Sequence, residues 1–182
     1  MSGVKGLRYD AAPILGLGEA SSNPLPDPAP GDVVIRVGAW SLDDLRVCEH
    51  VVRQRLIGDE DWEEDLPKLF PWFSAKLTPG VYRLRVPVPD SNRKTFSEQC
   101  QLLLPGEEVA PTTIVATTLI VHLMVAGQSL PNLPCGDVCR CAEPFKHDSR
   151  VGLYVTKNDV DIHHWWDDDR CDDIWLAASM KI

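Results

Sequence analysis

The chain has 182 residues, of which 44% are hydrophobic and 25% charged, and its formal net charge at neutral pH is −9. A chain of this length fits one domain, and its apolar fraction excludes an intrinsically disordered protein. The sequence also lacks the phosphate-binding, dinucleotide-binding and nucleophile-elbow motifs of common enzyme classes. We therefore expect a globular α+β domain with an acidic surface.

Negative charge is concentrated in two stretches of the chain. Six acidic residues lie between positions 59 and 65, and seven more lie between positions 159 and 173. Nucleic acids and anionic membranes are bound through basic surfaces, so this charge pattern predicts neither of them as a partner. The two stretches favour a basic protein or a divalent cation, although acidic surfaces can also serve only to keep a protein in solution.

Neither export nor a membrane anchor is indicated. Residues 1–20 lack the continuous apolar core of a secretory signal. The longest apolar run, residues 114–126, is shorter than the roughly 20 residues that span a bilayer. We therefore expect a cytoplasmic protein whose six cysteines remain reduced thiols.

Residues 1–31 are predicted to form an extended, proline-rich N-terminal arm. Four prolines alternate with other residues between positions 24 and 30, which favours a polyproline II path. The sequence leaves open whether this arm packs on its own domain or on a neighbouring copy. Residues 32–182 are then expected to form a single α+β domain.

Hydrophobic periodicity predicts a mainly antiparallel sheet of five or six strands packed by two helices. The expected strands are residues 32–40, 81–88, 138–143, 151–156, 160–166 and 174–180, and the expected helices are residues 112–126 and a segment between Ser41 and Gly58. Ser41 is the expected N-cap, with Asp44 in a near capping-box position. The helix expected at residues 112–126 is apolar on nearly all sides, which predicts a central core helix in which His122 is a hydrogen-bonded core residue.

Residues 59–80 are predicted to form a long loop that is partly packed. Its aromatic residues, which include Trp62, Phe70, Trp72 and Phe73, are too many for a mobile surface segment. They indicate either an aromatic binding lip edged by carboxylates or a loop pinned to the core by its rings.

Three cysteines, beginning with Cys135, follow one another with the spacing C-x3-C-x-C. On a strand, Cys139 and Cys141 face the same side, about 6.5–7 Å apart between Cα atoms, which strains a direct disulfide. Both could instead bind a tetrahedral zinc ion that His147 or Cys171 completes. The alternative is that these cysteines are buried structural thiols.

A second candidate metal site lies in the strand expected at residues 160–166 and the turn before it. Asp159, Asp161 and His163 alternate, so they share one face of the strand. Two carboxylates and an imidazole are suitable ligands for manganese, iron or zinc, and the carboxylates could act as general bases beside a metal-bound water. The alternative is the polar outer face of an antiparallel hairpin.

Tryptophan is unusually frequent, with six residues against four phenylalanines. Trp165 and Trp166 are adjacent, and because neighbouring strand residues face opposite sides, at least one ring should point to the surface. Asp167, Asp168 and Asp169 follow directly. An aromatic centre with a charged rim is the composition of a recognition patch, here for a basic partner.

Two functional hypotheses follow from these features. The first is a non-catalytic protein-interaction module that binds a basic partner through its acidic, tryptophan-bearing face and needs no cofactor. The second is a metal-dependent, hydrolase-like enzyme that uses zinc or another divalent metal at the Asp/His or Cys/His cluster. Oligomeric state is not indicated by the sequence.

Overall fold

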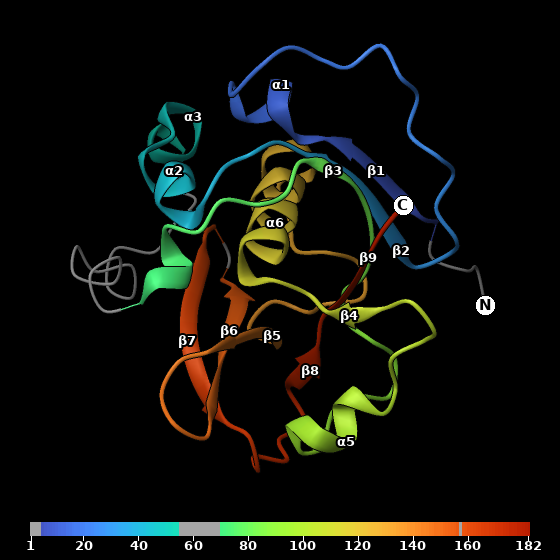
Figure 1. The fold of residues 1–182 in the computed structure, drawn as a ribbon, viewed down its shortest axis with the longest axis vertical. Helices are drawn as coiled ribbons and strands as arrows, with labels where there is room; N and C mark the ends of the chain where they lie inside the picture. Colours follow the sequence, from blue (N-terminus) through green and yellow to red (C-terminus); the bar gives the residue numbers. More distant parts are fainter. Residues whose placement is uncertain (1–4, 55–69, 157) are drawn as a thin grey trace.

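The structure, a computed structural model, describes residues 5–54, 70–156 and 158–182. The chain forms a mixed α+β fold in which two mostly antiparallel sheets lie around a central helix (Figure 1). This confirms the α+β class and the mainly antiparallel pairing predicted from the sequence. The sequence predicted one sheet of five or six strands, whereas the strands divide between a sheet of five and a sheet of four.

The first sheet has the strand order β1-β2-β3-β9-β4, and the second sheet has the order β7-β6-β5-β8. The strands of the first sheet are β1 (Leu7–Asp10), β2 (Asp32–Val37), β3 (Gly80–Arg85), β9 (Ala178–Lys181) and β4 (Glu108–Val109). The strands of the second sheet are β7 (Val160–Trp166), β6 (Ser149–Val155), β5 (Val138–Pro144) and β8 (Ile174–Leu176). The helices are α1 (Ala11–Leu15), α2 (Leu42–Val47), α3 (Glu49–Arg53), α5 (Phe96–Cys100), α6 (Thr112–Ala126) and the 3-10 turn η1 (Pro71–Phe73).

The two sheets are joined where the last two strands follow each other. Ala177 alone separates β8 from β9, so the chain passes from the second sheet to the first within one residue. Its N–H donates to the Arg140 carbonyl of β5 at 3.1 Å, and its own carbonyl accepts from the Ala110 N–H at 2.9 Å. Both alanines are fully buried at this junction between the sheets. The single strand predicted at residues 174–180 is therefore two strands in two sheets.

Helix α6 fills the space between the sheets. Twelve of its fifteen residues are buried, which confirms the prediction of a central core helix. The buried hydroxyls of Thr117 and Thr118 donate to carbonyls one turn earlier in the same helix. The Thr117 hydroxyl donates to the Thr113 carbonyl at 2.7 Å and accepts from the Trp40 indole at 3.1 Å.

The described part of the predicted N-terminal arm is more regular than expected. Strand β1 pairs in parallel with β2, and helix α1 ends at the buried Leu15. The Tyr9 hydroxyl lies 2.5 Å from Nδ1 of His122, so β1 is tied directly to α6 and His122 is a hydrogen-bonded core residue, as predicted. The extended arm was predicted from the prolines at positions 24–30, whereas the apolar pattern of residues 7–15 is too short to predict a strand or helix. Residues 7–15 thus belong to the packed core, whereas residues 17–30 are mostly exposed.

The helix predicted between Ser41 and Gly58 begins where expected but is interrupted. The Ser41 hydroxyl accepts from the Asp44 N–H at 3.2 Å, and Asp44 accepts from the Ser41 N–H at 2.7 Å, which completes the capping box. At Cys48 the backbone is extended, which separates α2 from α3. The Cys48 thiol donates to the Leu15 carbonyl at 3.0 Å, so this break lets the second helical segment dock on the N-terminal one. Residues 55–58 lie outside the described residues.

Acidification should destabilise the fold through His122. Burial lowers the pKa of His122 from its ordinary value of 6.5. The unfolded chain therefore takes up a proton at a higher pH than the folded chain, so stability falls as pH drops below about 6.5. We expect the free energy of unfolding, measured by urea titration with tryptophan fluorescence, to fall between pH 7 and pH 5 and to fall less in His122→Gln.

The exposed His147 provides the control for this experiment. His147→Gln should keep the pH dependence of the unaltered protein. An unchanged slope in His122→Gln would contradict the assignment. Some slope should remain in that variant, because burial also lowers the pKa of His164.

Candidate interaction site at the end of strand β7

The candidate site is the end of β7 and the turn that follows it, residues 166–169, which we call the acidic turn. β7 is an edge strand of the second sheet, and the acidic turn lies beside α5 (Figure 1). The Trp166 side chain at the end of the strand is 54% exposed. Among the tryptophans of the described ranges, it is the exposed one.

Trp165 lies on the other side of the strand and is half-buried. Its ring covers Gly152 of β6, where an added Cβ would lie 2.6 Å from the ring. The absence of a side chain at Gly152 thus leaves room for the Trp165 ring. The Tyr154 ring contacts the Trp165 ring edge-on, with 6.4 Å between the ring centroids. The expectation that one of the two adjacent tryptophans faces outward is confirmed, since Trp166 is exposed and neither ring enters the core.

The three aspartates of the acidic turn have different roles. Asp167 pairs with Arg150 of β6 at 3.3 Å, and its backbone bonds to neighbouring segments on both sides. The Asp169 carboxylate accepts from the Trp166 N–H at 3.1 Å and so closes the turn. Asp168 is exposed and forms no ion pair with the described residues. Among the described residues, Asp168 is therefore the aspartate of this turn with neither an ion pair nor a hydrogen bond to the turn backbone.

A fully buried arginine, Arg140 of β5, lies beneath the acidic turn. Its guanidinium donates to the carbonyls of Trp166 and Asp169, the latter at 3.2 Å. Two further bonds reach the Gln99 side chain at 3.2 Å and the Lys94 carbonyl at 3.3 Å. All of these acceptors are uncharged, and no carboxylate of the described residues forms an ion pair with Arg140.

The carboxylates of the acidic turn provide negative charge near the buried Arg140 guanidinium, which has no paired carboxylate among the described residues. Burial, the largest effect, lowers the pKa of Arg140, and the carboxylates of residues 167–169 oppose that shift. A buried cation without compensating charge is strongly unfavourable. From the sequence, these carboxylates were interpreted as a surface for a basic partner, but part of their charge stabilises the buried Arg140 cation.

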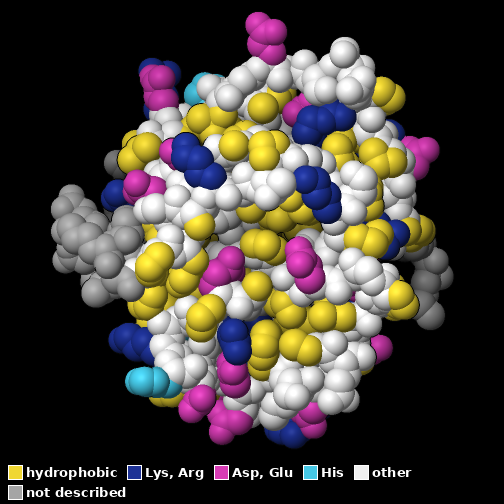
Figure 2. Space-filling view, in the orientation of Figure 1, with side chains coloured by type: hydrophobic (Ala, Val, Ile, Leu, Met, Phe, Trp, Pro, Cys, Tyr) yellow, Lys and Arg dark blue, Asp and Glu magenta, His cyan; other side chains and the backbone are white. Residues whose placement is uncertain are grey.

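Two further acidic side chains near the turn form ion pairs with arginines. Asp172 pairs with Arg93, and Arg170 pairs with Glu98 at 2.8 Å. Figure 2 shows acidic side chains gathered at the lower edge of the molecule with basic side chains among them. Part of the negative charge near the acidic turn is therefore paired with arginines of neighbouring segments.

A row of aromatic rings connects the candidate site to η1. The Phe145 ring stacks on His164 at 4.5 Å with an interplanar angle of 2°, and the Phe70 ring lies 4.6 Å from Phe145. The Trp72 indole donates to the Pro144 carbonyl at 3.1 Å. In the described part of the loop at residues 70–80 the rings thus pack on the second sheet, as expected for a pinned loop. Trp62 and the acidic stretch at 59–65 lie outside the described residues.

The structure places the Asp/His candidates on the outer side of β7, near Trp165. Asp161 and His163 share that face, with His163 exposed. Asp159 precedes the strand, and its carboxylate accepts from the Thr156 hydroxyl in the turn before β7. Nδ1 of the His163 ring donates to the His164 carbonyl of its own strand at 3.1 Å.

The cysteine candidates are divided between the core and the surface. Cys139 and Cys141 are fully buried, whereas Cys135, Cys171 and His147 are exposed. Burial raises the pKa of both Cys139 and Cys141, as is typical of buried structural thiols. Within residues 5–54, 70–156 and 158–182, no group of three or more His, Cys, Asp or Glu side chains is placed to hold a metal ion.

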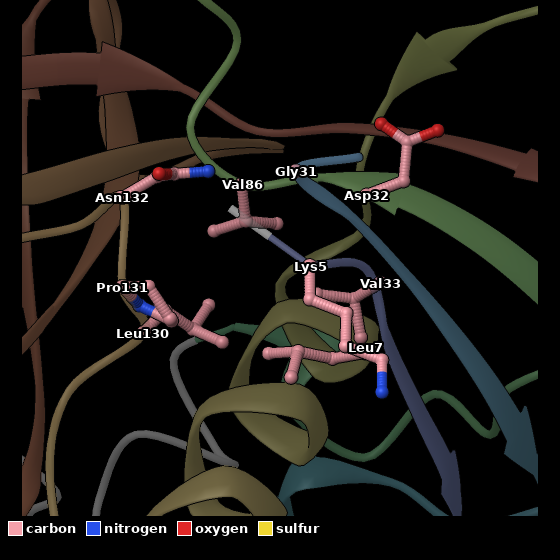
Figure 3. Close-up of a pocket in the computed structure, with 9 residues that line it drawn as sticks. All are labelled: Lys5, Leu7, Gly31, Asp32, Val33, Val86, Leu130, Pro131 and Asn132. Atoms are coloured by element: carbon pink, nitrogen blue, oxygen red, sulfur yellow. The ribbon is translucent and has the colours of Figure 1, made fainter. Parts of the chain in front are cut away.

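Three concavities formed by the described residues lie away from the acidic turn. One of about 260 Å³ is lined by Asp32, Arg85 and Asn132, and its Arg85 guanidinium is paired with Glu107. Figure 3 shows a small cleft near Leu130 and Asn132 in which the Asp32 carboxylate and the Lys5 amine point in opposite directions. A groove of about 240 Å³ runs past the start of α6, but the Glu143 carboxylate in it accepts from the Thr112 N–H at 2.8 Å and so caps the helix. The Arg85 guanidinium and the Glu143 carboxylate are thus already engaged within the protein, which disfavours a catalytic role for either.

Comparison of the chain with protein-family models, with curated proteins and with solved structures found no match. No helix among the described residues is long and apolar enough to cross a membrane. The functional argument therefore rests on the geometry of the site itself.

Thiol reactivity should follow the burial of the cysteines. A chromogenic thiol reagent added to the native protein should modify Cys135 and Cys171 first, because a thiolate at the surface is required for reaction. Cys48, Cys139 and Cys141 should react only after unfolding, when all six thiols become available. Mass mapping of the modified peptides gives the order, and rapid native labelling of Cys139 or Cys141 would contradict it.

Proposed function

We propose that the protein is a non-catalytic interaction module that binds a basic protein partner through Trp166 and the acidic turn. One observation carries the proposal: a large aromatic ring that is 54% exposed at the end of an edge strand, beside a carboxylate without an ion pair among the described residues. Exposed tryptophans at such positions are frequent centres of binding energy in protein interfaces.

The partner chemistry follows from the two displayed groups. An apolar side chain of the partner packs on the Trp166 ring, and a neighbouring lysine or arginine pairs with Asp168. The ring provides most of the affinity, because it can be fully desolvated. The carboxylate at the rim contributes mainly orientation and association rate.

The fixed geometry of the turn also supports this role. The Asp167 N–H donates to the Asp148 carbonyl at 2.7 Å, and the Phe96 N–H donates to the Asp167 carbonyl at 2.7 Å. A surface that is already ordered loses little conformational entropy when it binds. The proposal includes a reducing compartment such as the cytoplasm, where the six free thiols are stable.

Capture of cell proteins on the immobilised protein tests the proposal. Trp166→Ser should remove a specific captured protein, with an affinity loss of about 30-fold, the usual effect of truncating a central interface tryptophan. Asp168→Asn should weaken the same complex by only a few fold, and this difference should shrink as salt is raised. Quantitative mass spectrometry of the captured proteins and titration of the purified complex provide the measurements.

Val47→Ser is the matched control for the loss of an exposed apolar side chain. Val47 is 66% exposed on α2, away from the acidic turn in Figure 1. This variant should retain the complex. A set of captured proteins that is the same for Trp166→Ser and the unaltered protein would contradict the proposal.

A further inference from the structure

Arg140 connects two segments that lie far apart in the sequence. Its guanidinium donates to carbonyls at both ends of the acidic turn, Trp166 and Asp169. The same group also reaches α5 through Gln99 and the loop before that helix through Lys94. These carbonyls point inward to a fully buried side chain, so water cannot replace the bonds without opening the turn.

This arrangement requires the shape of arginine. A planar guanidinium carries five N–H donors in a fixed fork, which allows it to serve several carbonyls at once. A lysine ammonium is a single point on a flexible stem and would serve fewer of them. A methionine would fill the volume but leave the carbonyls of the turn unpaired.

We propose that Arg140 is the positioning residue of the partner-binding edge: it holds the acidic turn in the conformation that displays Trp166 and Asp168 together. The inference rests on the proposed function, because it concerns the same surface. Arg140 itself touches no partner, since it is fully buried. Its effect on binding passes entirely through the turn.

Hydrogen exchange in the free protein tests the first half of this inference. In Arg140→Met, the amides of Trp166, Asp167 and Asp169 should exchange at least about tenfold faster, because their hydrogen bonds within the turn and to the Asp148 carbonyl open more often. The amides of α6 should keep most of their protection. If Arg140→Met does not fold, Arg140→Lys should show the same local pattern to a smaller extent.

Arg93→Met is the matched control for removing one positive charge. Arg93 pairs with Asp172 beside the same acidic stretch, but both side chains are about two-thirds exposed, at 69% and 68%. Its removal leaves the backbone bonds of the acidic turn in place. Exchange at residues 166–169 should therefore match that of the unaltered protein.

Binding of an oligolysine peptide tests the second half. Both variants make the protein more negative by one charge, so charge alone predicts tighter binding of a basic peptide by both. If Arg140 positions the turn, the two variants should differ in their affinity for the peptide. Arg93→Met should bind it as tightly as the unaltered protein or more tightly, and Arg140→Met should bind it at least about threefold more weakly. The shift of the Trp166 indole NMR signal during titration reports binding at this edge.

The possible outcomes separate the inference from the proposed function. Unchanged exchange at residues 166–169 in Arg140→Met, or oligolysine binding as tight as in Arg93→Met, would overturn the positioning role. Oligolysine binding that Trp166→Ser leaves unaffected in the otherwise unaltered protein would contradict the proposed function instead. The exchange pattern would in that case still decide whether Arg140 holds the turn.

Discussion

A buried guanidinium that lacks a paired carboxylate is the constraint around which this end of the molecule is organised. Arg140 is fully buried and bonds only to uncharged acceptors. Such a cation is tolerated because carbonyl dipoles point at it and because the aspartates of the acidic turn lie near enough to lower its energy. The turn, the start of α5 and the end of β7 are therefore held in one arrangement, and Trp166 is displayed as a consequence.

Much of the fold could be predicted from local patterns. The apolar run of α6, the capping box at Ser41 and the alternating strands of the second sheet each follow from a period or a cap that neighbouring residues define. The division into two sheets could not be predicted, because it depends on a change of partner at Ala177 and not on any change in strand pattern. Strand β1 and helix α1 could not be predicted either, because they are too short to show a periodic hydrophobic pattern.

The candidate site was predicted in its residues but not in its electrostatics. The adjacency of Trp165 and Trp166 indicated an outward ring, and the three aspartates after them indicated an acidic rim. Arg140 had no signal in the sequence, because an arginine on a strand is usually solvent-facing and its acceptors come from positions 94, 99, 166 and 169. Its presence changes how the aspartates are interpreted: only Asp168 is clearly available to a partner.

The most direct test is the coupling energy between Arg140 and Asp169, obtained from the unfolding free energies of the two single variants and the double variant. Asp169→Asn keeps an oxygen that can accept from the Trp166 N–H, so it removes the charge with little change in shape. If the turn supplies counter-charge to the buried arginine, Asp169→Asn should cost at least about 0.5 kcal/mol more in the unaltered protein than in Arg140→Met. Additive effects of the two substitutions would contradict the account.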